Sequence, residues 1–262
     1  MGTSSLFDVS FSSGIKTITM KDTRSRNALS LNMQKELYKY ITADWDDKKL
    51  RAIVLQAEGP AFSSGHNLKE FNFDTNDKSL LEEVFKMATK LMLSITECPV
   101  PVIACVNGIA AAAGCQLAAQ CDIVVASDKS LFSTPGVSVG VFCSSPGIPI
   151  SRTIPRKLAT YMLTTGLPIT ATEAKSAGLV SVVCPEDQLK GQVEKICAAI
   201  TAKSRYVVTK GKRFYYRQID MTMKEAYKIG ELEMIERISE SEGQEGLKSF
   251  IEKRKPNWKH SV

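Results

Sequence analysis

The chain has 262 residues, of which 44% are hydrophobic and 24% charged, and its formal net charge is +6. This is the composition of an ordinary globular protein, long enough to bury one large core. The sequence lacks the arginine-rich runs with interleaved aromatic residues that are typical of nucleic-acid-binding proteins, so nucleic-acid binding is excluded. A membrane span is excluded as well, because no run of about 18 apolar residues occurs.

The residue types that bind metals are scarce or badly spaced. The seven cysteines form no CxxC pair, and there are only two histidines. We therefore expect buried, reduced thiols and no metal site. Residues 1–5 have neither the basic nor the apolar part of a secretory signal, so we expect a cytoplasmic location unless an organelle presequence has been removed.

The first half of the chain alternates strand and helix patterns. Runs at 7–11 and 15–20, separated by Ser12, Ser13 and Gly14, predict a hairpin. Ser30 can cap a helix that carries Met33, Leu37 and Ile41 on one face. Further apolar strands are predicted at 52–56, 102–106 and 123–126, and helices at 81–95 and 112–120. Such alternation with short connections predicts parallel strands joined by right-handed crossovers.

The second half becomes helical. A helix over 157–165 ends at Gly166, a capping box at 170–173 opens a short helix, and residues 180–183 form one more strand. After Pro185 only helical periodicity remains, over 189–202, 206–214, 223–238 and 243–254. We divide the chain into a core domain, 1–200, and a C-terminal helical region, 201–262, involved in oligomer packing.

Two segments are candidates for chemistry. In the first, residues 58–70, a strand leads through Gly65 into a polar helical start, where a glycine lets the backbone approach a ligand closely. Taken alone, this is also an ordinary strand-to-helix loop. In the second, residues 107–116, four alanines and Gly114 leave the N–H groups of a helix start accessible to an oxyanion or a phosphate. Tight helix packing explains the same small residues equally well.

A third segment, residues 132–147, is a loop rich in glycine and proline after a strand, at the edge where open α/β folds bind ligands. The three segments occur in order with the pieces 26–30, 99–104, 121–123 and 246–257. Together they resemble the crotonase superfamily, also called the enoyl-CoA hydratase/isomerase family, over nearly the whole chain. The resemblance implies an α/β crotonase fold, in which repeated ββα units form two stacked sheets followed by a C-terminal helical region.

The resemblance also implies a site for an acyl-CoA thioester. In the family two backbone N–H groups stabilise a thioester enolate, and the matching positions are those of His66 and Ala113. The implied substrate-binding residues are Ser64, Gly65, Lys69, Gly114, Phe250 and Lys253. No metal or separate cofactor is implied, because coenzyme A is part of the substrate. A homotrimer or hexamer in the mitochondrial matrix is also implied.

The sequence departs from the family at the acid–base positions. Family hydratases carry one glutamate where this chain has Gln116 and a second where it has Gly136. A glutamine cannot take up a proton near neutral pH, and glycine has no side chain to do so. The acid that dienoyl isomerases use is replaced by Ser144. We therefore expect an oxyanion hole without fast standard hydration, in an enzyme of the hydratase/isomerase family (lyase class) with weak or altered activity in acyl-CoA metabolism.

Three hypotheses follow. In the first, the chain is an enzyme that needs only enolate stabilisation, such as a malonyl-type acyl-CoA decarboxylase. In the second, it is a non-catalytic or weakly catalytic acyl-CoA sensor. In the third, it is a structural or interaction protein that has kept only the oligomeric scaffold of the family. The 64–67 segment resembles the corresponding loop of methylmalonyl-CoA decarboxylases, although a tyrosine that those enzymes carry near Cys143 is missing. As replacement acids, Asp122 reads as a strand-edge cap and Glu70 as a solvent-facing charge. Cys143 and Ser144 are expected to line the acyl pocket as poor bases.

Overall fold

Two β-sheets and ten α-helices make up the fold in the computed structural model, which describes residues 5–260. The larger sheet has the strand order β1-β2-β3-β5-β7-β10, formed by Phe7–Ser12, Ile15–Met20, Ala52–Ala57, Val102–Val106, Ile123–Ser127 and Val182–Cys184. The smaller sheet has the order β4-β6-β8-β9, formed by Ala61–Ser63, Ile109–Ala111, Leu131–Ser133 and Ile169–Thr170.

The strand pairing follows the sequence pattern. The predicted hairpin is confirmed, since β1 and β2 pair antiparallel from Phe7 opposite Met20 to Ser12 opposite Ile15. The next pairs, β2–β3, β3–β5, β5–β7 and β7–β10, are all parallel, as the strand–helix alternation predicts. Parallel strands place their carboxyl ends at one edge of a sheet, and this arrangement brings successive loops together.

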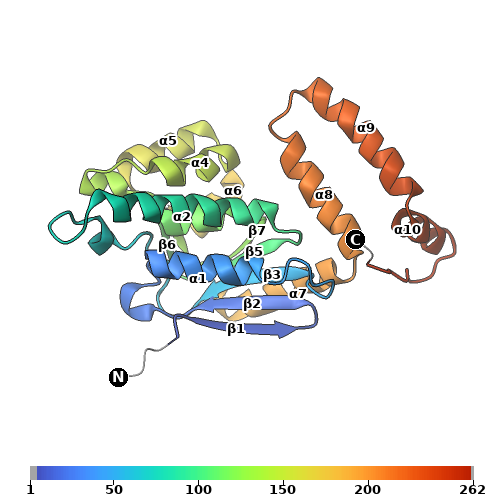
Figure 1. Cartoon of the computed structure of the whole chain (residues 1–262), viewed down its shortest axis with the longest axis horizontal. Helices are drawn as coiled ribbons and strands as arrows, with labels where there is room; N and C mark the ends of the chain where they lie inside the picture. Colours follow the sequence, from blue (N-terminus) through green and yellow to red (C-terminus); the bar gives the residue numbers. More distant parts are fainter. Residues whose placement is uncertain (1–4, 261–262) are drawn as a thin grey trace.

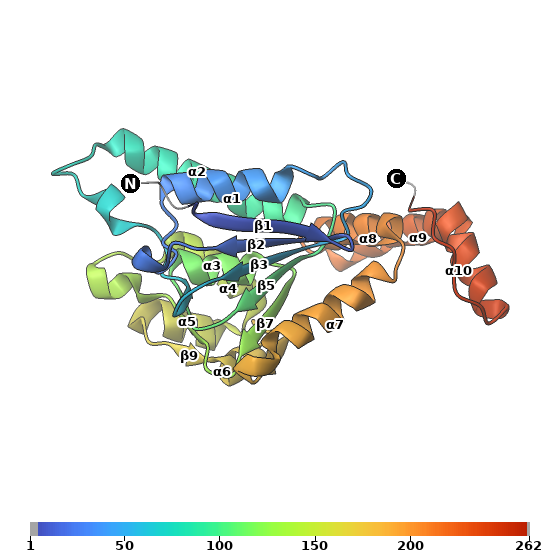
Figure 2. The ribbon, with the colours of Figure 1, turned by 90° about the horizontal axis from the view of Figure 1, so that it is seen from below.

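Helices cover both faces of the larger sheet (Figures 1 and 2). The helices before the C-terminal region are α1 Leu31–Thr42, α2 Lys78–Glu97, α3 Ala113–Gln120, α4 Ser144–Thr153, α5 Arg156–Thr165, α6 Ala171–Ala177 and α7 Leu189–Thr201. Short 3-10 turns are η1 Thr23–Ser25, η2 Leu68–Phe71, η3 Pro135–Val139 and η4 Glu186–Gln188. The predicted cap is confirmed, because the Ser30 hydroxyl oxygen accepts the Met33 N–H at 3.2 Å.

Successive side chains of β3 point to opposite faces of the sheet and pack in two separate hydrophobic clusters. Ile53 and Leu55 pack with α1 and α2 in the main cluster, whereas Ala52 and Val54 face α7 in a second cluster. Burying an aliphatic side chain stabilises the fold by about 1.5–3 kcal/mol, so this alternation fixes which face each helix covers. All seven cysteines are buried and unpaired, which confirms that they pack as small apolar residues.

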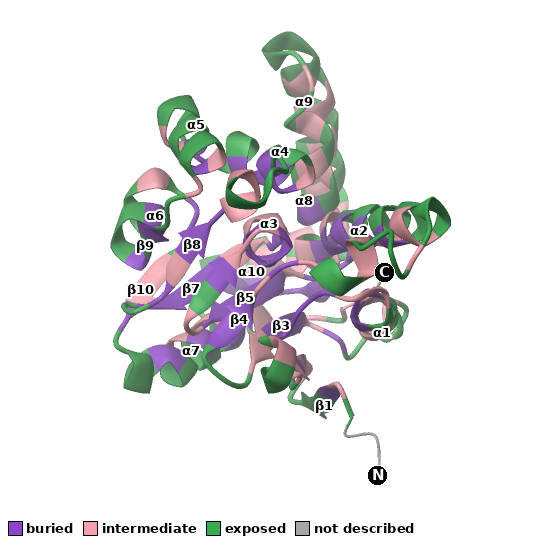
Figure 3. Cartoon of the chain, turned by 90° about the vertical axis from the view of Figure 1, so that its left-hand side faces the viewer, coloured by how far each residue is buried: buried purple, intermediate pink, exposed green. Residues whose placement is uncertain are grey.

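Three helices follow the core: α8 Arg205–Gln218, α9 Met223–Ser239 and α10 Ser241–Ile251. They extend from one side of the sheets as an arm, and α9 lies mostly exposed (Figures 1 and 3). No residue of α9 is buried, although it carries Leu232, Met234 and Ile235. Among residues 5–260, no helix combines the length and the apolar character needed to cross a bilayer.

Candidate functional site

The segment after β4 is held by hydrogen bonds to the chain before α1. Ser64 N–H donates to Arg26 O at 3.0 Å, and Leu29 N–H donates to Gly65 O at 2.7 Å. Gly65 adopts a φ of +94°, which glycine reaches without strain. A trans peptide places its carbonyl and N–H on opposite sides, so the bond from Leu29 turns the N–H of His66 away from Leu29.

The start of α3 is built in a similar way. Ala112 N–H donates to Ser133 O at 2.9 Å, and Ala112 O accepts the Gln116 N–H at 3.0 Å within the first helical turn. Because that carbonyl points along the helix, the N–H of Ala113 points out of its N-terminal end. Ala112 has a φ of +48° and no side-chain cap covers this end. The buried Ala113 therefore presents an N–H without an intrahelical partner.

These two segments touch. A Cβ placed on Gly65 would lie 2.9 Å from Ala112 Cβ and 3.1 Å from Ala113 N, which is closer than ordinary contact. Within residues 5–260, neither the N–H of His66 nor that of Ala113 has a hydrogen-bond acceptor. Two unpaired backbone donors on adjoining segments, one of them at a helix N-terminus, can bind an oxygen that carries negative charge.

The His66 imidazole is enclosed. Its ring centroid lies 5.6 Å from that of Phe71 and 5.2 Å from that of Phe85. Nδ1 is 3.4 Å from Leu29 O and 3.4 Å from Gln34 Nε2, while Nε2 is buried without a partner. Burial lowers the pKa of His66 below its ordinary value, so the ring is neutral near pH 7. A ring held in this way leaves only the backbone N–H free to bind a ligand.

The lowered pKa predicts a pH dependence of stability. The unfolded chain takes up a proton near the ordinary histidine value of 6.5, whereas the folded chain resists it. Stability is therefore present above pH 6.5 and is lost as the pH falls from there through the lower folded-state pKa. We expect His66→Phe to lose less stability on acidification than the parent chain. Urea unfolding midpoints measured across this range test the difference, and parallel pH profiles would contradict it.

Gln116 and Gly136, where the resemblance led us to expect the missing acid–base pair, differ in their surroundings. Gln116 lies in the first turn of α3, is 5% exposed, and its Oε1 has no hydrogen-bond partner. At Gly136, the N–H donates to Cys143 Sγ at 3.3 Å and the carbonyl oxygen accepts Val141 N–H at 2.9 Å. A Cβ on Gly136 would lie 2.7 Å from that sulfur and even closer to Val141 O. The Cys143 sulfur and the Val141 carbonyl oxygen therefore occupy the space that a side chain at residue 136 would need.

The replacement acids considered from the sequence are occupied. Both carboxylate oxygens of Glu70 accept the Leu31 N–H at 3.1 Å, so the expectation of a solvent-facing charge is wrong. Glu70 caps α1, where a carboxylate complements the helix dipole. Asp122 accepts the Val102 N–H at 2.7 Å, which confirms the strand cap, and it also pairs with Lys212. Burial raises the pKa of the Cys143 thiol, and Ser144 lies exposed at the start of α4.

The remaining predicted residues fall into two groups. Ser64 and Gly65 directly precede His66, Gly114 directly follows Ala113, and Lys69 is exposed on η2, three residues after His66. Phe250, which is 84% exposed, lies in the last turn of α10, and Lys253 follows that helix. In both ribbon views α10 lies at one end of the molecule, away from the start of α2 (Figures 1 and 2). Within one chain the structure does not bring this second group to the donors.

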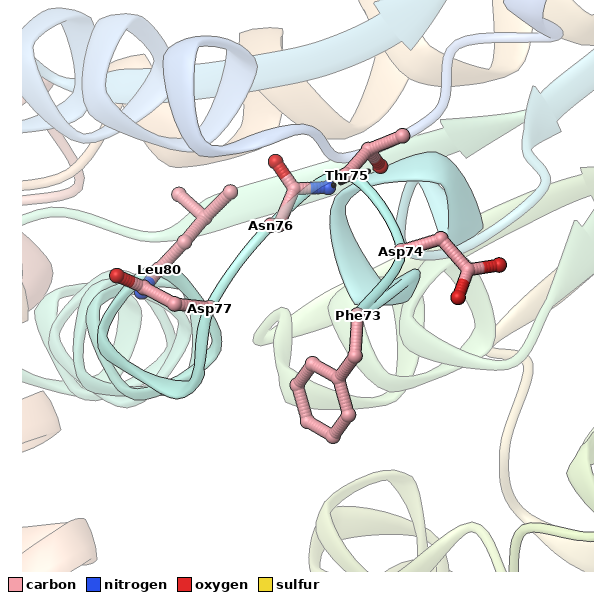
Figure 4. A pocket seen from close by; sticks show the side chains of 6 residues that line it. All are labelled: Phe73, Asp74, Thr75, Asn76, Asp77 and Leu80. Carbon is pink, nitrogen blue, oxygen red and sulfur yellow. Dashed lines mark hydrogen bonds between the residues drawn. The ribbon is translucent and has the colours of Figure 1, made fainter.

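An open hollow lies beside η2, and Figure 4 shows its lining residues, Phe73, Asp74, Thr75, Asn76, Asp77 and Leu80. Its amide and carboxylate groups serve local structure, since Asn76 Nδ2 donates to Lys69 O at 2.9 Å and Asp77 Oδ1 caps α2. Over residues 5–260, no three His, Cys, Asp or Glu side chains gather as metal ligands do.

Sequence reasoning missed Gln34. This fully buried residue of α1 donates through Nε2 to Leu29 O at 2.9 Å, next to the His66 ring. The available signal is its spacing, because Gln34, Leu37 and Ile41 recur at helical intervals on the buried face. A buried amide in an apolar stripe requires a specific partner, and that partner is the backbone beside the donor segment.

A family model described as enoyl-CoA hydratase/isomerase matches residues 10–261. The chain belongs to this family, the crotonase superfamily. It is 52% identical over 248 residues to enoyl-CoA hydratase domain-containing protein 3, mitochondrial, of Xenopus laevis, covering 95% of this chain and 84% of the relative. The expected superfamily is thereby confirmed.

Solved structures from the crotonase superfamily confirm the fold. The crystal structure of human enoyl-CoA hydratase domain-containing protein 3 matches with a TM-score of 0.95 and 46% identity, covering 97% of this chain and all of the other. An enoyl-CoA hydratase from Mycobacterium smegmatis matches with a TM-score of 0.93 and 39% identity, covering 97% and 99%. The predicted α/β fold with a C-terminal helical region is that of these crotonase-family proteins.

Proposed function

We propose that this chain binds acyl-CoA thioesters and polarises the thioester carbonyl through the backbone N–H groups of His66 and Ala113. The observation that carries the proposal is that these two unpaired donors lie on touching segments. Preorganised donors of this kind each contribute about 3–4 kcal/mol to stabilising an oxyanion. Ser64 and Lys69 flank the thioester site, where the Lys69 ammonium suits the nucleotide phosphates. Coenzyme A belongs to the substrate, so no separate cofactor is needed.

The test is infrared difference spectroscopy of bound butyryl-CoA labelled with ¹³C at the thioester carbonyl. Hydrogen bonding from two donors shifts the carbonyl stretch to lower frequency, and calorimetry with the same ligand gives the affinity. An unshifted carbonyl, or the absence of binding, would sink the proposal. Tight binding without turnover of any thioester would support the sensor hypothesis over the enzyme.

Standard hydration is not part of the proposal, because Gln116 and Gly136 supply no acid or base. We expect Gly136→Glu to destabilise the fold by about 1–3 kcal/mol, since its Cβ collides with Val141 O and Cys143 Sγ. Gln116→Glu combined with Gly136→Glu should therefore leave crotonyl-CoA hydration undetectable. Loss of the enoyl absorbance measures the rate. Ser138→Glu is the control for stability, because Ser138 is exposed on the same turn and a glutamate there adds the same charge without a collision. A stable double variant that hydrates quickly would refute this account.

Decarboxylation of a malonyl-type CoA is the second candidate. It needs an enolate but no base, because neutral carbon dioxide leaves and the electron pair of the broken C–C bond stays on the α-carbon, so that the negative charge of the carboxylate passes to the enolate oxygen. Gln116 and Gly136 favour it, since neither places a negative charge where that carboxylate would lie. Release of carbon dioxide from malonyl-, methylmalonyl- and ethylmalonyl-CoA tests it, and no release above that of the Gly65→Pro variant would exclude it.

We also propose that the chain assembles as a homotrimer or a dimer of trimers, in which Phe250 and Lys253 reach the site of a neighbouring copy. The exposed apolar residues of α9 and α10 support this, since a monomer would leave them in water. Sedimentation that gives a monomer at high concentration would contradict it. The mitochondrial names of the relatives support a mitochondrial location, and fractionation of cells that express the chain tests that location.

A further inference from the structure

The His66 side chain lies in a cage whose walls come from three parts of the fold. Phe71 belongs to η2 and Phe85 to α2, and their rings stack with centroids 5.5 Å apart. Gln34, from α1, contacts the remaining edge of the imidazole. Each aromatic contact contributes about 0.5–1.5 kcal/mol beyond the area that it buries. The cage therefore fixes the Cα of His66 relative to α1 and α2.

A chain of hydrogen bonds connects this cage to the donor peptide. Gln34 Nε2 holds Leu29 O at 2.9 Å, and the N–H of Leu29 holds Gly65 O at 2.7 Å. The carbonyl of Gly65 and the N–H of His66 belong to one rigid peptide plane. A rotation of Leu29 would therefore rotate that plane and re-aim the N–H.

Glutamine is costly at this position. Gln34 is fully buried, and its Oε1 has no hydrogen-bond partner. An apolar side chain would avoid the penalty of about 1–3 kcal/mol that an unpaired buried acceptor carries. The bond from Nε2 to Leu29 O is what the amide supplies in return, and that bond acts on the donor segment.

We propose that Gln34 and the His66 side chain are positioning residues that set the direction of the His66 N–H, Gln34 through Leu29 and the imidazole by packing in its aromatic cage. The inference rests on the proposed function, because it concerns how the thioester carbonyl is gripped. Neither side chain touches the thioester. The ring acts by its shape, so a phenyl ring of similar size replaces it.

The test uses the full chain and ¹³C-labelled butyryl-CoA. Gln34→Met keeps the side-chain length without the donor, His66→Ala removes the ring, and His66→Phe retains a ring. We expect Gln34→Met and His66→Ala to lose at least half of the carbonyl shift and about tenfold in affinity for butyryl-CoA, the equivalent of one weakened hydrogen bond. Binding of free coenzyme A, which has no thioester carbonyl, should remain at the parent value. His66→Phe, which retains a ring in the cage, should keep more of the carbonyl shift and of the affinity than His66→Ala.

Lys35→Met is the matched control, because this residue lies next to Gln34 on the exposed side of α1 and, within residues 5–260, pairs only with Glu83. Should His66→Ala unfold, His66→Leu fills most of the volume without a ring and carries the same expectation. Parent-like carbonyl shifts in folded Gln34→Met and His66→Ala would overturn the inference while leaving the proposed function intact. An unshifted carbonyl in the parent chain would overturn both.

Discussion

Replacing Gly114 with alanine is expected to cost the site most of its grip on a thioester carbonyl. The new Cβ would lie 2.7 Å from Ser63 Cβ and still closer to Ser63 O. Ser63 cannot retreat, because it is fully buried and its hydroxyl donates to Asn27 O at 2.8 Å. The first turn of α3 must therefore move away from β4, and the N–H of Ala113 moves with it.

We expect two measurable losses from Gly114→Ala. Overpacking should lower the free energy of unfolding by about 1–3 kcal/mol. Losing one of two oxyanion donors should reduce turnover of any thioester substrate by about 10²–10³-fold, and the carbonyl shift of bound butyryl-CoA should shrink. Steady-state kinetics, denaturant unfolding and the infrared measurement check these effects.

Gly191→Ala provides the matched control, because this glycine is exposed on α7 and a Cβ there meets nothing within 4 Å. An alanine in an exposed helix interior is expected to stabilise by about 0.5–1 kcal/mol without affecting ligand binding. If Gly114→Ala behaved like Gly191→Ala, the close approach of α3 to β4 would be irrelevant to the site.

The local signals in the sequence were sufficient for most of the fold. Ser30, the capping box at Thr170 and the glycine after residue 165 each act on backbone within a few residues, and each stands where predicted. The interpretation was wrong for α4, where a loop was expected. Pro149 lies inside this helix, where proline removes a helical hydrogen bond, so local propensity opposes it. Packing against α3 outweighs that propensity.

The smaller sheet could not be predicted from the sequence pattern either. Its strands have only two or three residues, too few for a period of two to be recognised. The last strand of the larger sheet, expected over 180–183, lies at Val182–Cys184. The division at residue 200 into a core and a helical region remains a prediction.

In the candidate site, too, the features that local sequence patterns indicate were predicted, and the features that depend on distant contacts were not. Glycine and alanine patterns marked the donor segments as candidates, and the resemblance to the family implied the positions of the two donors. The closure of Cys143 over Gly136, the cap that Glu70 forms on α1, and the contact of Gln34 with Leu29 join residues that are distant in sequence or depend on loop geometry. No local pattern encodes them, although the buried spacing of Gln34 was visible.

The buried pair that fastens the arm to the core gives the largest expected effect on stability. Lys212, in α8, donates through Nζ to Ile95 O at 2.8 Å, Val100 O at 3.0 Å and Asp122 Oδ2 at 2.6 Å. An ammonium has three donors, so all are used. Burial, followed by the Asp122 carboxylate, raises the pKa of Tyr216, whose hydroxyl donates to Asp122 Oδ1 at 2.7 Å.

We expect Lys212→Met to lower the free energy of unfolding by about 3–5 kcal/mol, because the Asp122 carboxylate and two carbonyls are left buried without their cation. Tyr216→Phe should cost less, about 1.5–3 kcal/mol, for one hydrogen bond to a charged group. Arg213→Met, which removes an exposed cation from the same helix, should have little effect. Denaturant unfolding of the three variants gives these values.

A double-mutant cycle of Lys212→Met with Asp122→Asn separates the pair from general damage to the helix. Removing both charges should cost less than the sum of the single losses, since neither charge is then stranded. Because α8 carries α9 and α10, Lys212→Met should also make sedimentation depend more strongly on protein concentration. Additive losses, or a Lys212→Met loss below about 1 kcal/mol, would mean that contacts other than this ion pair hold the arm in place.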